Sequence, residues 1–192
     1  MDTSRAQQPT GIDRILVPGI LAGMVAAVPM ALLAMVVSAT IHERGFFTPL
    51  YLITSLVGDG AISRSLRQAA QGQQFTALVE PLVFGSAVHL TLGAFFGALF
   101  AALAQKVPKR LTLAASVAYA LVVMLVMVFI LVPLADAGLS GPRSLEGLVS
   151  KAGLWTLIGQ HVVFGLVVGW WPWLRPRPLR QRLRAPSPMR AR

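Results

Sequence analysis

Four long apolar runs constrain this chain more than any other feature of its sequence. They cover about residues 15–41, 81–104, 111–134 and 153–174, and none contains Asp, Glu, Lys or Arg. About 20 mostly apolar residues in a helix cross the hydrocarbon core of a bilayer. An apolar strand would leave its backbone polar groups unpaired in lipid, so each run is expected to be helical. The sequence therefore predicts an all-α, polytopic membrane protein with four transmembrane helices.

Composition agrees with a chain whose main solvent is lipid. Only 12% of the 192 residues are charged, whereas a soluble domain averages about 25%. The absence of cysteine excludes disulfides, thiolate metal sites and thiol catalysis. Seven of the 17 basic residues lie in the last 18 positions, after an apolar run. The net charge is +10. Because the basic residues follow an apolar run, they are expected to bind anionic lipid headgroups rather than nucleic acid.

The distribution of Lys and Arg predicts the orientation in the membrane. One side of the predicted topology carries Arg5, Arg14, Lys106, Lys109, Arg110, Arg175, Arg177, Arg180, Arg182, Arg184, Arg190 and Arg192. The other side carries Arg44, Arg64, Arg67, Arg143 and Lys151. Because basic residues stay in the cytoplasm, both termini are expected there. Arginine supplies 14 of the 17 basic residues, which suggests a bacterial source and therefore the bacterial inner membrane.

The segments outside the runs complete the predicted organisation. Residues 1–14 form a cytoplasmic N-terminus, and residues 15–174 form the membrane domain. The outer loop 42–80 contains an apolar stretch, 46–57, that is too short to span and is expected to form an interfacial helix or to re-enter partway. The Arg- and Pro-rich tail 175–192 cannot build a core and is expected to be disordered near the inner leaflet. Its headgroup contacts are assigned to Arg175, Arg177, Arg180, Arg182 and Arg184.

The second and fourth runs share a motif, His-x-x-x-Gly-x-x-x-Gly. It comprises His89, Gly93 and Gly97 in one and His161, Gly165 and Gly169 in the other, offset by 72 residues. A spacing of four keeps these residues on one helix face. Small residues let helix backbones approach closely in a membrane. The predicted helix-packing glycines are Gly19, Gly23, Gly85, Gly93, Gly97, Gly165 and Gly169.

The motif also predicts how the runs associate. The first, second and fourth runs are expected to make the tight contacts, because the third shows no such stripe and is expected to be more exposed to lipid. The offset of 72 residues suggests two repeated helix pairs, related by an axis along the membrane normal.

The two motif histidines are the candidate functional residues. His89 and His161 each lie about eight residues into their runs, roughly 12 Å below the outer boundary. They could ligate haem b through two axial imidazoles, or hold a metal ion with His42. Alternatively, each neutral imidazole makes a structural hydrogen bond across the bundle. The structural interpretation is preferred, and no cofactor is predicted, because two histidines with no carboxylate nearby make a poor metal site.

The motif segments, together with the opening Gly19-Ile-Leu-Ala-Gly23, resemble those of uncharacterised small bacterial inner-membrane proteins that carry only a domain-of-unknown-function label. The resemblance implies a four-helix inner-membrane fold and carries no catalytic residue over. The leading hypothesis is a non-enzymatic membrane subunit with a structural or partner-interacting role, associating with copies of itself or with a larger complex. The alternatives are a haem- or metal-binding protein that uses His89 and His161, and a small transporter.

The charge distribution makes a prediction about topology. Reporter domains fused after Arg192 and near Gly72 should report the cytoplasm and the periplasm, respectively, because basic residues resist translocation. Activity of paired alkaline phosphatase and green fluorescent protein fusions measures this. The opposite pattern would refute the orientation.

Overall fold

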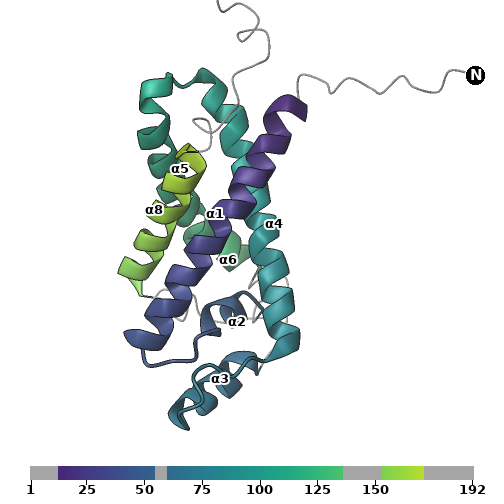
Figure 1. Ribbon diagram of the computed structural model, residues 1–192, viewed down its shortest axis with the longest axis vertical. Helices are drawn as coiled ribbons and strands as arrows, with labels where there is room; N and C mark the ends of the chain where they lie inside the picture. Colours follow the sequence, from purple (N-terminus) through teal and green to yellow (C-terminus); the bar gives the residue numbers. More distant parts are fainter. Residues whose placement is uncertain (1–12, 55–59, 136–152, 171–192) are drawn as a thin grey trace, which may run out of the picture.

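A computed structural model describes residues 13–54, 60–135 and 153–170 of the chain (Figure 1). Three expectations concern residues outside these ranges. They are the cytoplasmic N-terminus over most of its length, the end of the fourth run after Trp170, and the tail with its five headgroup arginines.

Every element of the described ranges is a helix. The long ones are α1 (Asp13–Thr40), α4 (Val79–Leu103), α5 (Thr112–Val126) and α8 (Leu154–Trp170). Three helical stretches are long and apolar enough to cross a membrane, Ile15–Thr40, Val79–Lys106 and Lys109–Leu131. The apolar helix α8 is shorter, at 17 residues. These three to four helices fit a multi-pass membrane protein, as the apolar runs predicted.

The four long helices pack in the spatial order α4, α1, α8, α5. Helix α1 contacts both α4 and α8, α5 packs on α8, and α4 touches α5 at few points. One of those points is Tyr119, whose hydroxyl donates a 2.9 Å hydrogen bond to the carbonyl of Phe96. Tyr119 therefore joins the two outermost helices of the row.

Glycines bring α1 and α4 into backbone contact. A Cβ atom placed on Gly93 would lie 2.8 Å from the Ala27 side chain and 2.8 Å from the carbonyl of Gly23. Gly97 lies in the same way against Gly19 and Gly23. These contacts occupy one face of each helix, the face that the spacing of four defines.

The contact between α5 and α8 corrects one expectation. The third run was expected to lack a stripe of small residues and to be more exposed to lipid. Instead Thr112, Ser116 and Ala120 form such a stripe, and all three are buried. Gly165 lies against Ser116 and Ala120, and Gly169 lies against Ser116. The expectation was wrong because it looked for stripes built around glycine, although Ser, Thr and Ala without glycine also permit close approach.

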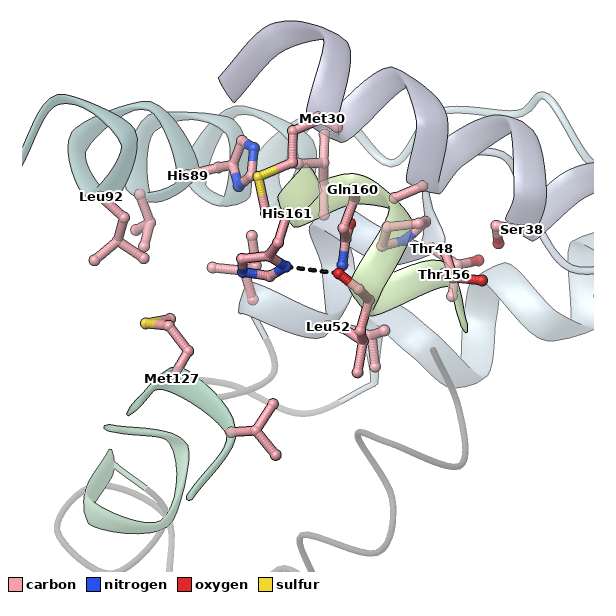
Figure 2. A pocket seen from close by; sticks show the side chains of 18 of the residues that line it. Met30, Ser38, Thr48, Leu52, His89, Leu92, Met127, Thr156, Gln160 and His161 are labelled. Atoms are coloured by element: carbon pink, nitrogen blue, oxygen red, sulfur yellow. Dashed lines mark hydrogen bonds between the residues drawn. The ribbon is translucent and has the colours of Figure 1, made fainter. Parts of the chain in front are cut away.

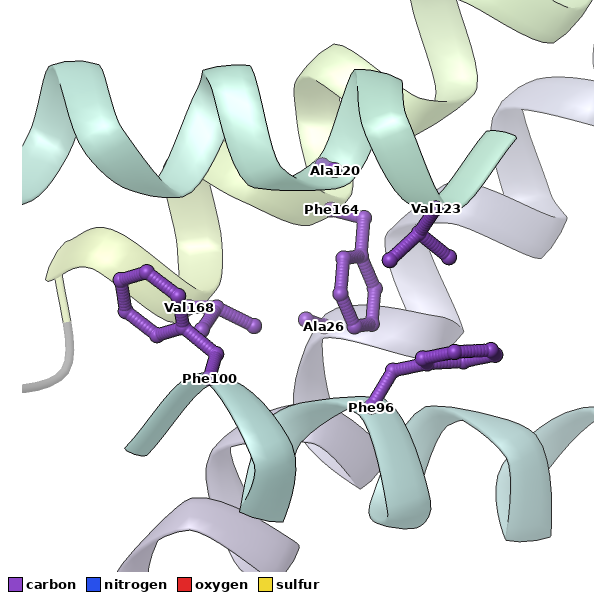
Figure 3. Close-up of a cluster of buried hydrophobic side chains, with 7 residues drawn as sticks. All are labelled: Ala26, Phe96, Phe100, Ala120, Val123, Phe164 and Val168. Atoms are coloured by element: carbon purple, nitrogen blue, oxygen red, sulfur yellow. The ribbon is translucent and has the colours of Figure 1, made fainter. Parts of the chain in front are cut away.

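The centre of the bundle is filled by an aromatic and aliphatic core to which all four helices contribute (Figure 3). Its buried members are Ala26, Phe96, Phe100, Ala120, Val123, Phe164 and Val168. The rings of Phe100 and Tyr119 add a contact with centroids 5.3 Å apart. This core occupies the space between α4 and α5, whose backbones do not pack closely.

Two short helices lie in the long loop, α2 (Thr48–Thr54) and α3 (Ala61–Ala70). Helix α2 falls within the stretch 46–57 that was expected to be helical, and it contacts both α1 and α4. Figure 1 shows α1 and α4 diverging towards this end of the bundle, with α2 between them. The carbonyl of Leu50 on α2 packs against Gly85 on α4, where any side chain would clash with it. The Thr54 hydroxyl donates a 2.9 Å hydrogen bond to the carbonyl of Pro81. We call this end of the bundle the loop end.

The glycine contacts predict a contrast within α8. Gly165→Ala should lower the free energy of unfolding by about 1–3 kcal/mol, because its Cβ would lie 2.7 Å from the Val117 Cα atom, and backbone cannot easily yield. Gly159→Ala is the matched control, since its Cβ would meet only Leu33 at 3.8 Å. The control should stabilise by roughly 0.5–1 kcal/mol through helix propensity. Reversible unfolding in mixed micelles measures both; equal effects would contradict the packing.

Candidate functional site

A cavity of about 210 Å³ lies among α1, α2, α4, α8 and the π-helical segment Met127–Leu131 that follows α5. Its walls are mostly apolar. The polar residues that line it are Ser38, His42, Arg44, Thr48, His89, Thr156, Gln160 and His161 (Figure 2). All three histidines of the chain therefore line one cavity, which we call the histidine cavity.

His89 connects two helices. It lies on α4, and its Nε2–H donates a 3.0 Å hydrogen bond to the carbonyl of Ala27 on α1. This carbonyl is within reach because Gly23 and Gly93 bring the two backbones together. Since Nε2 carries the proton in this bond, Nδ1 keeps its lone pair. Among the described residues, no hydrogen bond to Nδ1 is found.

His161 is bonded differently, although it occupies the equivalent place in the motif. It is buried on α8, with 7% of its surface exposed, and its Nδ1–H donates a 2.7 Å bond to the carbonyl of Leu157, one turn earlier. The lone pair then lies on Nε2. Figure 2 shows both imidazoles beside Met30, which lines the cavity with them. The two rings thus offer two hydrogen-bond acceptors to the same space.

His42 lies towards the loop end of the histidine cavity, just after α1. Its Nε2 is buried and has no hydrogen-bond partner in the described ranges. The ring packs against Gly153, whose φ of 78° and a 3.3 Å approach to His42 disfavour any side chain there. Gly153 directly precedes α8, and His161 lies eight residues later, roughly 12 Å along the helix axis. His42 and His161 therefore lie at different depths of the cavity. No three His, Cys, Asp or Glu side chains in the described ranges could hold one metal ion.

The wall of the cavity opposite α1 is a π-helix. Met127 and Val128 belong to it and line the cavity. Pro133 follows two residues after the segment and supplies no N–H to the preceding turn, which is a reason for the altered hydrogen bonding there. Single-turn π-helices within α-helices are frequent at functional sites.

The arrangement can bind by hydrogen bonding. A buried polar atom left unpaired costs free energy unless a partner or a water molecule satisfies it. Among the atoms that line the cavity, this penalty falls on the buried, unpartnered Nε2 of His42. The remaining ring nitrogens of His89 and His161, with the amide of Gln160 beside them, can also accept a hydrogen bond from an occupant. Two of the three hydroxyl groups that line the cavity are already engaged, since Ser38 donates to the Gly45 carbonyl at 3.0 Å and Thr48 bonds Ser65 at 2.9 Å.

The motif identified His89 and His161 as candidate site residues but did not place Gln160 and Thr156 beside them. Gln160 directly precedes His161, and Thr156 lies one turn before Gln160 on the same helix. That spacing of four was the available signal. No sequence spacing indicated that α2 and the π-helix also line the cavity, because their positions depend on contacts between distant parts of the chain.

The hydrogen bond of His89 generates a prediction. His89→Ala should lower the free energy of unfolding in micelles by about 0.6–2 kcal/mol, the range for interhelical bonds in membranes. His89→Gln should lose less, because its amide can donate to the same carbonyl. Thr91→Val, an exposed position bonded only within its own helix, is the control and should change little. If His89→Ala matched this control, the cross-helix bond would contribute nothing.

Comparison with protein-family models, curated proteins and solved structures finds no match to this chain. The resemblance drawn from the motif therefore stays a prediction.

Proposed function

We propose that this chain is a non-enzymatic multi-pass membrane protein that binds a small, largely apolar molecule through hydrogen bonds to His89 and His161. One observation carries the proposal. Two imidazoles from different helices line one cavity, and each uses one ring nitrogen in a backbone hydrogen bond. The remaining lone pairs suit a ligand with an O–H or N–H donor on an apolar body, such as a phenol, an alcohol or a quinol.

An organic ligand suits the cavity better than haem b or a metal ion. Sites for drug-sized molecules measure about 300–1,000 Å³, and the histidine cavity is smaller, at about 210 Å³. A haem is larger than such molecules. His89 would also have to ligate through Nδ1, the nitrogen beside the attachment of the ring to the chain. A Soret band in the purified protein would overturn this choice.

We further infer that the domain consists of two repeated helix pairs in the inner membrane of a bacterium, with both termini in the cytoplasm. The charge distribution supports the orientation. The repeat is supported by packing: the stripe Gly19, Gly23 and Ala27 of α1 meets Gly93 and Gly97, and the stripe Thr112, Ser116 and Ala120 of α5 meets Gly165 and Gly169. Both stripes keep a spacing of four, at an offset of 93 residues.

Phenol and toluene test the binding proposal, because they have nearly the same shape and differ in one hydroxyl group. The protein in neutral micelles should bind phenol more tightly than toluene by about tenfold, the value of one good hydrogen bond. The ¹⁵N chemical shift of His161 Nε2 should move when phenol is added and should not move with toluene. Titration followed by nuclear magnetic resonance measures both quantities.

Variants distinguish binding in the cavity from partitioning of the compounds into the detergent micelle. His161→Phe removes one acceptor at similar volume and should abolish the preference for phenol. Thr91→Val, at an exposed position that does not line the cavity, should keep it. Equal affinity of the native protein for phenol and toluene would contradict the proposal, and so would a preference that survives in His161→Phe.

A further inference from the structure

A second cavity, separate from the histidine cavity, lies at the opposite end of the bundle. It also measures about 210 Å³. Its apolar side is formed by core residues, Phe100 of α4 and Val168 of α8, with Ala101 and Ala104 beside them. Its polar side is formed by Gln105, Lys109 and Thr112. We call it the turn crevice, because the turn between α4 and α5 borders it.

Positive charge gathers at this turn. Lys106, Lys109 and Arg110 are all exposed there, and Lys109 also lines the crevice. Of the acidic residues in the described ranges, Glu43 and Glu80 lie towards the loop end, and only Asp13, at the start of α1, lies at this end. The charged residues of the turn itself are therefore all basic.

The turn also has a defined height relative to a bilayer. It joins Val79–Lys106 to Lys109–Leu131, and both stretches are long and apolar enough to span. A bilayer that both stretches cross must have the turn at its surface, where the phosphates of lipid headgroups lie. The tail of the chain is an unsuitable occupant, because its seven arginines have the same sign as the turn.

We propose that the turn crevice binds one anionic phospholipid. Its phosphate pairs with Lys109, with Lys106 and Arg110 adding to the attraction, and its glycerol and first methylenes lie against Phe100 and Val168. The mixed lining supports this occupant, because a phospholipid places a charged group and an apolar chain within a few ångströms of each other. Basic pockets between transmembrane helices bind anionic headgroups in this way.

The test uses the full chain in neutral detergent, with phosphatidylglycerol and phosphatidylcholine of identical acyl chains. Native mass spectrometry should show one phosphatidylglycerol retained in preference to phosphatidylcholine. Lys109→Gln should weaken phosphatidylglycerol binding about fivefold, as expected for one basic residue near the surface. Arg67→Gln is the control of equal charge change, because Arg67 lies on α3 at the loop end and should leave binding unchanged.

A second pair of variants tests the crevice itself. Ala104→Phe fills it and should abolish the preference, whereas Ala102→Phe, at an exposed neighbouring position, should keep it. Equal retention of the two lipids, or equal loss in Lys109→Gln and Arg67→Gln, would overturn the proposal. Soluble glycerol phosphate that competes as well as the lipid would overturn it too, because the site would then bind a free anion.

Discussion

Close approach of helix backbones at small residues is the constraint on which the rest of this structure depends. Lipid chains are as apolar as leucine, so burial alone does not hold transmembrane helices together. Gly23 and Gly93 bring α1 against α4, and Ser116 and Gly165 bring α5 against α8. The same contact places the Ala27 carbonyl within reach of His89. A hydrogen bond and a cavity wall thus follow from residues that have almost no side chain.

The two ends of the bundle differ because the helices meet closely in one region and diverge in another. Towards the loop end α1 and α4 separate, and α2 occupies the space between them (Figure 1). The histidine cavity lies beneath α2, where the small-residue contacts give way to larger, apolar walls. At the other end, the bundle presents exposed basic residues at a tight turn. The ligands proposed for the two ends differ accordingly, a largely apolar molecule in the histidine cavity and an anionic lipid in the turn crevice.

The sequence predicted the elements better than their partners. Runs without charge located α1, α4, α5 and α8, because the length needed to cross lipid is fixed by the bilayer. The glycine motif located the packing faces on α4 and α8. It did not identify α5 as the partner of α8, because α5 contains no glycine and its small residues on this face are Thr112, Ser116 and Ala120. The cavity could not be predicted, since the position of α2 depends on contacts such as Leu50 with Gly85.

Disulfide cross-linking in native membranes tests the pairing of helices most directly, because the chain has no cysteine of its own. The packing predicts that cysteine pairs at Ala27 with Gly93, and at Ala120 with Gly165, cross-link far faster than a pair at Gly93 and Gly165. Their Cβ positions lie 2.8 and 3.1 Å apart, slightly closer than the roughly 3.5–4.5 Å of a relaxed disulfide, so the helices separate a little to form the bond. A pair at Gly93 and Gly165 should not cross-link, because each glycine faces its own partner helix. Efficient cross-linking of Gly93 with Gly165, and none in the other two pairs, would contradict the account.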